Sequence, residues 1–220
     1  ASLQLLRLKN VLNVVDPLRQ VVKNFKSELL SKGSELLNDE RIDVIRKLLD
    51  DRFSSENIGG TKKNSLIQQH RKCYAIKEGV SVNLDVARRA YEELLRGVQE
   101  QEKELTKYLP GQDTRLAFSK ARGFHYVWVC GDAGTVEVPS IFVNVVRNRS
   151  SLTFTSRNLL RYNDRIEQSI SEVMIATNVV VEEVIKEVRP SIAVLYHVMD
   201  CLATTDFLCS LAVYAFNRET

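Results

Sequence analysis

The stretch from 84 to 109 reads LDVARRAYEELLRGVQEQEKELTKYL and decides much of the fold. Its apolar residues recur in alternating steps of three and four, while the other faces carry mainly Arg, Lys and Glu. A narrow apolar seam on a charged helix is typical of a coiled-coil arm. At about 1.5 Å per residue the helix is roughly 39 Å long, and Pro110-Gly111 ends it. The seam consists of Leu84, Ala87, Tyr91, Leu94, Val98, Leu105 and Tyr108.

A second seam of similar length lies downstream, between an expected N-cap at Ser156 and a break at Pro190. Two such seams separated by a compact insert are expected to fold back on each other as an antiparallel pair. The last helix, over about 191–217, is apolar on more than one face, which predicts a place in a core at the base of this arm. The second seam consists of Leu159, Tyr162, Ile166, Ile170, Val173, Thr177, Val180, Val184 and Val188.

The N-terminal part of the chain is also helical in pattern. Residues 3–30 carry apolar side chains at helical spacing, and Asp16-Pro17 predicts a new helix start within this run. Asn38-Asp39 predicts the N-cap of another helix that extends to about Phe53. Residues 54–63, with Gly59-Gly60, predict a loop, and helical pattern is expected again from about residue 64.

Between the two seams the periodicity becomes alternating, which predicts about four short strands. The alternation covers 124–130, 136–138, 141–145 and 152–154, with a turn over 131–134. Phe124, Tyr126 and Trp128 share one face, which suits either base stacking or the covered side of the sheet. We favour the covered side, because a small sheet needs large residues there.

These patterns predict a mainly α fold with a small β insertion. Antiparallel arm helices carry a four-stranded head at the tip and a helical core at the base. The expected divisions are a helical core segment over 1–63, an outgoing arm helix over 64–113, a β-rich head over 114–155, a returning arm helix over 156–189 and a core helix over 190–220.

Positive charge is concentrated in the head. The whole chain carries a net charge of +3, whereas residues 114–161 contain seven Lys and Arg against Asp132 and Glu137. The run Arg147-Asn148-Arg149-Ser150-Ser151 predicts a polar loop between strands that suits phosphate contacts without reading of bases. Charge alone leaves open whether these residues bind nucleic acid or only solubilise the sheet. The seven are Arg115, Lys120, Arg122, Arg147, Arg149, Arg157 and Arg161.

Catalytic and metal-binding patterns are absent from the sequence. It has no Gly-rich phosphate loop and no nucleophile elbow, and its four Cys and three His lack metal-ligand spacing. His125 is interpreted as an outward-facing strand residue, and Glu182-Glu183 as solvated helix charges. No unbroken run of eighteen apolar residues and no signal-peptide pattern occurs, so we expect neither membrane insertion nor secretion. The abrupt ends favour a piece of a longer protein.

Several stretches resemble the DNA mismatch-repair MutS homologue family. The run 83–89, with Leu84-Asp85 and Arg88, is similar to a signature on the family's outgoing lever helix. Residues 121–127 resemble the first long strand of its clamp domain, 152–156 followed by Leu159 the entry to the returning lever, and 203–214 the core helix before the ATPase domain. Four shorter stretches, 15–18, 71–75, 119–124 and 154–156, are similar to the meiotic class of fourth MutS homologues.

The resemblance implies a DNA-embracing lever and clamp. In the family two subunits surround DNA, and clamp loops touch its phosphate backbone. For the meiotic class it implies a nuclear, chromosomal protein that pairs with the fifth MutS homologue and embraces duplex or four-way (Holliday) junctions during crossing over. The chain ends before the ATPase domain, so we expect no catalysis and no cofactor here, with ATP and Mg²⁺ belonging to the full-length protein.

The resemblance also orders the candidate phosphate contacts. Arg149 is first and Arg147 second; Asn148 and Ser150 lie in the same loop, and Lys120 and Arg122 complete the set. Three alternatives stay open. The chain is a coiled-coil arm that docks a protein, an RNA-binding arm, or part of a mismatch-repair homologue outside the meiotic class.

Overall fold

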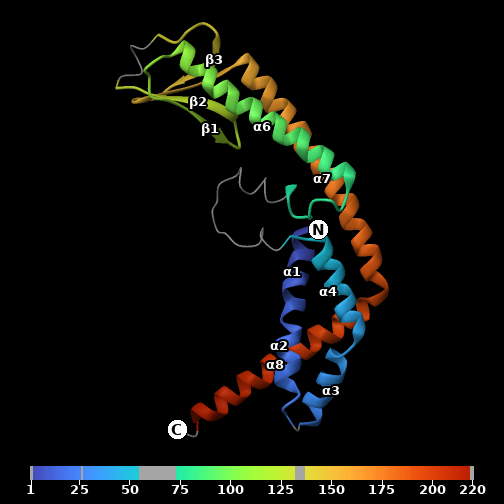
Figure 1. The fold of residues 1–220 in the computed structure, drawn as a ribbon. Helices are drawn as coiled ribbons and strands as arrows, with labels where there is room; N and C mark the ends of the chain where they lie inside the picture. The colour runs from blue at the N-terminus through green and yellow to red at the C-terminus, as the bar shows by residue number, and fades with distance from the viewer. Residues whose placement is uncertain (1, 26, 55–72, 132–136, 219–220) are drawn as a thin grey trace. The chain divides into compact units, whose positions relative to one another are not determined.

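A computed structural model describes residues 2–25, 27–54, 73–131 and 137–218 (Figure 1). It is mainly α-helical with one four-stranded antiparallel sheet, which confirms the coarse fold class. The chain divides into two compact units, one of 1–59, 75–77 and 178–220, and the other of 60–74 and 78–177. The elements are α1 (Ser2–Asn13), α2 (Val15–Val22), α3 (Glu28–Leu37), α4 (Glu40–Arg52), α6 (Val82–Tyr108), β1 (Thr114–Ser119), β2 (Gly123–Val129), β3 (Phe142–Arg147), β4 (Ser151–Ser156), α7 (Arg157–Val188), the 3-10 helix η1 (Arg189–Ser191) and α8 (Ile192–Arg218).

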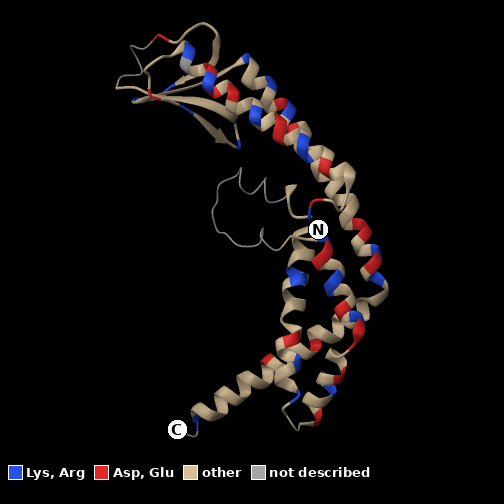
Figure 2. Cartoon of the chain, viewed as in Figure 1, with Lys and Arg blue, Asp and Glu red and all other residues tan. Residues whose placement is uncertain are grey.

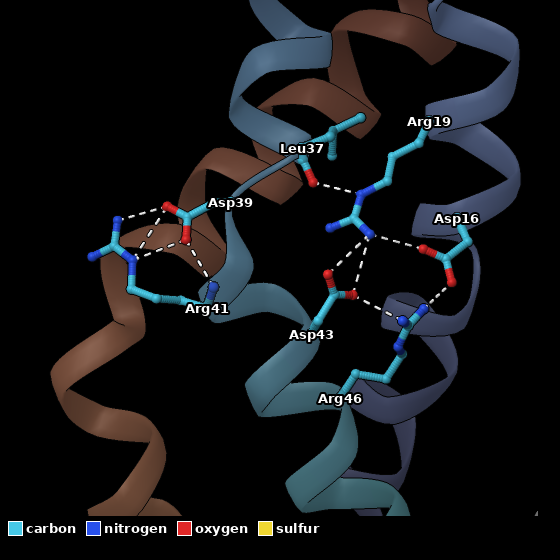
Figure 3. Close-up of polar contacts among 7 residues, drawn as sticks. All are labelled: Asp16, Arg19, Leu37, Asp39, Arg41, Asp43 and Arg46. Atoms are coloured by element: carbon cyan, nitrogen blue, oxygen red, sulfur yellow. Dashed lines mark hydrogen bonds and ion pairs between the residues drawn. The ribbon is translucent and has the colours of Figure 1, made fainter.

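The first unit is held partly by a network of ion pairs between α2 and α4 (Figure 3). The Arg19 guanidinium donates to Asp16 at 2.9 Å and to Asp43 at 3.1 Å, and its Nε donates to the Leu37 carbonyl at 2.6 Å. Arg46 pairs with the same two carboxylates. Its hydrogen bond to Asp16 is the main cause that lowers the pKa of this carboxyl. Each cation therefore bridges two acids, which fixes α2 against α4.

Two of the predicted helix starts are confirmed, and one helix was missed. α2 begins at Val15 beside Asp16-Pro17, and the Asp39 side chain accepts the Arg41 backbone N–H at 2.9 Å as the N-cap of α4. The sequence reading joined residues up to 30 into one helical run, whereas α3 (Glu28–Leu37) is a separate helix. Gly33 lies inside it, and glycine has a low helix propensity. Tertiary packing on α8 compensates, since the Cβ-free Gly33 lies beside Cys201.

The helix α8 is only half covered by the described residues. Its first half packs into the first unit through Val194, Val198 and Cys201, as the sequence predicted, whereas residues 209–218 are all exposed. One helical stretch among the described residues, Arg157–Arg218, contains an 18-residue window long and apolar enough to cross a membrane by length and composition alone, and 17% of that window is buried. The core helix of a soluble protein passes the same test, so the absence of membrane insertion stays an expectation from the sequence.

In the second unit the end of α6 lies beside the start of α7. Buried residues at seven-residue spacing occur on both helices, and on α7 Ser169 and Thr177 are buried as well. Gly97 of α6 lies against the Tyr162 ring of α7, where an added Cβ would come within 2.5 Å of a ring carbon. The pairing is antiparallel, because Glu104 and Tyr108 share a hollow with Arg157 and Asn158 at the start of α7. The residues at this spacing are Leu84, Tyr91, Val98 and Leu105 on α6 and Leu159, Ile166 and Val173 on α7.

The sheet has the strand order β1-β2-β4-β3, with every neighbouring pair antiparallel. Four strands were predicted, but not all in the right places. β1 covers Thr114–Ser119, which the alternation count missed, and residues 137–139 lie outside the strands. Phe124, Tyr126 and Trp128 are buried, which confirms the covered-face interpretation over a stacking platform. Tyr126 tilts onto Phe154, and Phe142 meets Tyr108 of α6 edge-on.

An asparagine on α7 fixes the sheet to the helix pair. The Asn163 side-chain oxygen accepts the Phe124 backbone N–H at 2.9 Å, and its amide nitrogen donates to the Phe124 carbonyl at 2.9 Å. The neighbouring Gly123 has a φ of +67° and so lies in the left-handed region. A Cβ at Gly123 would lie 2.8 Å from the Asn163 carboxamide. Gly123 therefore permits both the backbone turn and the close approach of the Asn163 side chain.

We predict that Gly123→Ala lowers the free energy of unfolding by about 1–3 kcal/mol, because it adds backbone strain and a clash with Asn163. Urea denaturation followed by Trp128 fluorescence measures the change. Gly111→Ala separates the two causes, since Gly111 has a φ of +74° but nothing within 4 Å of its Cβ position. Gly131→Ala, with open space and no positive φ, is the neutral control. A loss no larger than that of Gly111→Ala means that the Asn163 contact adds nothing.

Candidate nucleic-acid interface

The first-ranked phosphate contacts lie in the hairpin that joins β3 to β4. Residues 147–150 are all exposed, and the Asn148 backbone N–H donates to the Ser151 carbonyl at 2.8 Å to close the turn. Among the described residues no carboxylate pairs with Arg149. An exposed guanidinium without an acidic neighbour is well suited to bind a phosphate oxygen pair. The structure thus brings Arg147, Asn148, Arg149 and Ser150 together in one exposed turn, which we call the 147–150 hairpin.

Lys120 and Arg122 lie at the opposite end of the sheet. They occupy the turn between β1 and β2, whereas the far end of β2 adjoins the 147–150 hairpin through the Cys130 N–H, which donates to the Ser150 carbonyl at 3.0 Å. The seven residues of β2 separate the two turns by roughly 20 Å at strand spacing. The six predicted residues therefore form two separate groups, and the two groups cannot bind the same phosphate.

The surroundings of the two groups also differ. Lys120 and Arg122 line a hollow of about 460 Å³ together with Asp164 and Glu167 of α7. These carboxylates offset part of the positive potential at that turn, since opposite charges at short range cancel the field seen by an approaching anion. The 147–150 hairpin is the stronger candidate for phosphate contact.

The cations of the head do not gather on one face of the sheet. Arg147 lies opposite Leu152 in the strand register, and Leu152 lies opposite Trp128. The Arg147 side chain therefore begins on the same face of the sheet as the buried aromatic residues. Arg115 pairs with Val127 and so starts from the other face, because side chains alternate along a strand. Lys and Arg residues are spread around the sheet and the first turns of α7 (Figure 2). Any polyanion would therefore contact a subset of them.

A further row of arginines lies on α7, and the sequence reading found it only in part. Arg157, Arg161 and Arg165 are exposed and recur every four residues, so they follow one another along the helix at about 6 Å. Arg161 and Arg165 share a hollow of about 280 Å³ with Gln101 of α6. Arg165 lies just beyond the predicted basic segment 114–161, although its spacing of four residues from Arg161 is visible in the sequence. Like charges at this spacing cost about 0.2–0.5 kcal/mol per pair, so the row suits an anionic partner.

The Leu84-Asp85…Arg88 signature has a structural role. The Arg88 side chain is 4% exposed, donates from Nε to the Cys73 carbonyl at 2.8 Å and lies 3.5 Å from Asp85. Its guanidinium stacks on the Tyr74 ring with 5.0 Å to the ring centroid. Burial lowers the pKa of Arg88. The signature therefore anchors the start of α6 to the segment before it.

Metal chemistry finds no support in the described ranges. In 2–25, 27–54, 73–131 and 137–218 no three His, Cys, Asp or Glu side chains converge on a possible ion site. Cys73, Cys130, Cys201 and Cys209 are all free thiols. The arrangement offers phosphate-binding side chains and apolar packing surfaces.

Comparison with known proteins identifies the class of the chain. No protein-family profile matches it. It is 42% identical to the MutS protein homolog him-14 of Caenorhabditis elegans over 99% of the chain, and 31% identical to the human MutS protein homolog 4 over 94% of the chain. The chain belongs to the MutS homologue family, and the resemblance drawn from its sequence motifs is confirmed.

Within that family the similarity is to one group. The relative from Saccharomyces cerevisiae, 24% identical over 93% of the chain, is also named MutS protein homolog 4. The chain is thus similar to the fourth MutS homologues over nearly its whole length. It spans about a quarter of the length of these relatives, 26% of the nematode protein and 22% of the human one.

Proposed function

We propose that this chain is a lever and clamp region that grips the DNA backbone, as part of a MutS-family protein that acts in meiotic recombination. The observation that carries the proposal is the 147–150 hairpin, exposed at one end of the sheet, with Arg149 unpaired by any described carboxylate. In this reading α6 and α7 are the paired levers, and the sheet is the clamp.

The contacts on offer favour the phosphate backbone over base edges. Arginine binds two phosphate oxygens at once through its planar guanidinium, and Asn148 and Ser150 add neutral hydrogen-bond groups. The row on α7 adds three more cations in the same unit. Binding through phosphates releases counterions, so affinity falls steeply with salt and depends little on base sequence.

The wider role is what the resemblance to the fourth MutS homologues implies, and it is part of the same proposal. A full-length protein would add an ATPase domain with ATP and Mg²⁺, and would pair with the fifth MutS homologue. The pair would act on chromosomes in the nucleus, at duplex or four-way junction DNA. The chain itself would contact the DNA backbone and would supply no catalytic step.

The test is the double change Arg147→Glu and Arg149→Glu, measured by gel shift at two salt concentrations with duplex, four-way junction and structured RNA. We expect at least tenfold weaker binding to every DNA at low salt. The salt slope should fall by about 2, roughly 0.9 for each lost phosphate contact. Lys186→Glu with Arg189→Glu is the matched control, because both residues are exposed cations of the other unit and the charge change is equal.

Other outcomes of this experiment support other functions. DNA affinity that matches the control double variant excludes the 147–150 hairpin as the contact. Equal affinity for RNA and junction DNA favours an RNA-binding arm. A protein-docking arm has its own basis in the edge strand β3, where Val145 and Val146 are 37% and 39% exposed. In that case binding to the partner protein is insensitive to salt and is lost on Val145→Ser.

A further inference from the structure

The sheet carries a second hollow, on the face opposite its buried aromatic residues. This outer hollow has a volume of about 520 Å³ and is built by β2, β3 and β4, the turn before β2 and the first turn of α7. Among the described residues no carboxylate lines it, although Arg122 also lines the neighbouring hollow that contains Asp164 and Glu167. Its polar lining residues are Arg122, His125, Asn144, Thr153 and Thr155.

Thr155 supplies the strongest sign that the hollow has a ligand. The residue is 5% exposed, and among the described residues its hydroxyl oxygen has no hydrogen-bond partner. A buried hydroxyl without a partner is costly, and such groups in folded proteins are rare. Thr155 pairs with Val143 of β3 and starts from the outer face of β4, so its hydroxyl adjoins the hollow. A ligand atom that accepts this hydrogen bond would remove the cost.

The backbone of β3 is distorted at the same place. Its register shifts between Val143 and Val146, and Asn144 has a φ of +55°. A left-handed conformation is uncommon outside glycine, although asparagine tolerates it better than most residues. A bulge re-aims side chains and occurs often beside functional sites. Here it brings Asn144 to line the hollow, where its carboxamide provides two N–H donors.

Two further groups complete the polar lining. The Nδ1 of His125 lies 2.9 Å from the Gly123 carbonyl, which can only accept, so Nδ1 carries the proton in this bond. This fixes the ring, and Nε2 of the neutral ring is then an acceptor that can meet an O–H group of a phosphate. Arg122 supplies the guanidinium, and its backbone N–H donates to the Ser119 hydroxyl, which fixes the turn.

We propose that the outer hollow binds a phosphate group. Its donors are one guanidinium, one hydroxyl and one carboxamide, its imidazole adds an acceptor for a phosphate O–H, and no carboxylate occurs among the described lining residues. Side-chain donors that converge in this way match the several acceptor oxygens of a phosphate. The phosphate comes either from the backbone of a bound DNA strand or from a free phosphate or phosphomonoester. The first source rests on the proposed function, and the second does not.

The test uses inorganic phosphate as the probe and Thr155→Val as the key variant, in the whole chain labelled for NMR. Valine has the shape of threonine without the hydroxyl, so the sheet should keep its packing. We expect phosphate, titrated at constant ionic strength against chloride, to shift the signals of Thr155, Asn144 and His125 in the parent protein. Thr155→Val should raise the phosphate Kd by about tenfold, the effect of one hydrogen bond to a charged group. Thr114→Val, on β1 and outside the hollow, should leave Kd unchanged.

The two sources of phosphate are separated by adding duplex DNA to the phosphate-bound protein. Displacement of phosphate from these residues shows that a backbone phosphate takes the site, and retained phosphate shows that the ligand is free phosphate or a monoester. The absence of shifts with both probes, or an unchanged Kd in Thr155→Val, overturns the inference. That failure is distinct from failure of the proposed function, because Arg147→Glu with Arg149→Glu tests the 147–150 hairpin at the other end of β2.

Discussion

Replacing Arg88 with methionine is expected to lower the free energy of unfolding by about 3–5 kcal/mol, because removal of one partner strands a buried charge. The Arg88 guanidinium is the cation beside Asp85, whose side chain is 15% exposed, and it is a donor to the Cys73 carbonyl. Methionine keeps the length of the aliphatic stem, so the loss of the charge dominates. Part of the loss is offset because Asp85 also accepts the Gly79 backbone N–H at 2.9 Å.

Urea denaturation measures this change with two signals. Trp128 is the only tryptophan of the chain and is buried in the sheet of the second unit, so its fluorescence reports unfolding of that unit. Circular dichroism follows the helices. Arg89→Met is the control, since Arg89 is an exposed neighbour, and should change stability by less than about 0.5 kcal/mol. Adding Asp85→Asn to Arg88→Met should recover part of the loss if the two charges interact. Equal losses in the Arg88 and Arg89 variants contradict the anchor role.

Tyr91→Ala is expected to destabilise the second unit by about 3–5 kcal/mol, the usual cost of deleting a buried aromatic side chain. Tyr91 is 1% exposed, occupies one of the seven-residue seam positions of α6 and is among the largest fully buried side chains. Burial also raises the pKa of the Tyr91 hydroxyl to about 12. Truncation leaves a cavity that a rigid helix pair cannot close, so the loss exceeds simple transfer of the ring to water.

The same Trp128 signal measures the Tyr91 variant, and Val86→Ala is its control. Val86 lies on the same helix at 59% exposure, so its truncation should change stability by less than about 0.5 kcal/mol. Tyr91→Phe separates the ring from the hydroxyl and should retain most of the stability. A loss in Tyr91→Ala that matches the Val86 control would mean that the seam adds little to the packing of α6 on α7.

Much of the helical structure was readable because helix periodicity is local. The seam from Leu84 to Leu105, the N-cap at Asp39 and the N-cap at Ser156 all follow from residues within a few positions of one another. The Ser156 hydroxyl accepts the Leu159 N–H at 3.1 Å, as the sequence predicted. Strands were harder, because β1 has a short and weak alternation whose meaning comes from pairing with β2. α3 was missed for a similar reason, since its stability depends on α8, far along the chain.

The sequence predicted which residues belong to the candidate site, but it did not predict their arrangement in space. The sequence alone determined that cations concentrate between the two seams, that Arg147 to Ser150 form one loop, and that the chain resembles the MutS homologues. Only the tertiary structure decided that Lys120 and Arg122 lie a strand length away beside two carboxylates, and that Thr155, Asn144 and His125 share a hollow. The physical reason is that charge and helical period are properties of neighbouring residues. Strand order and register, in contrast, bring together groups that are distant in the chain.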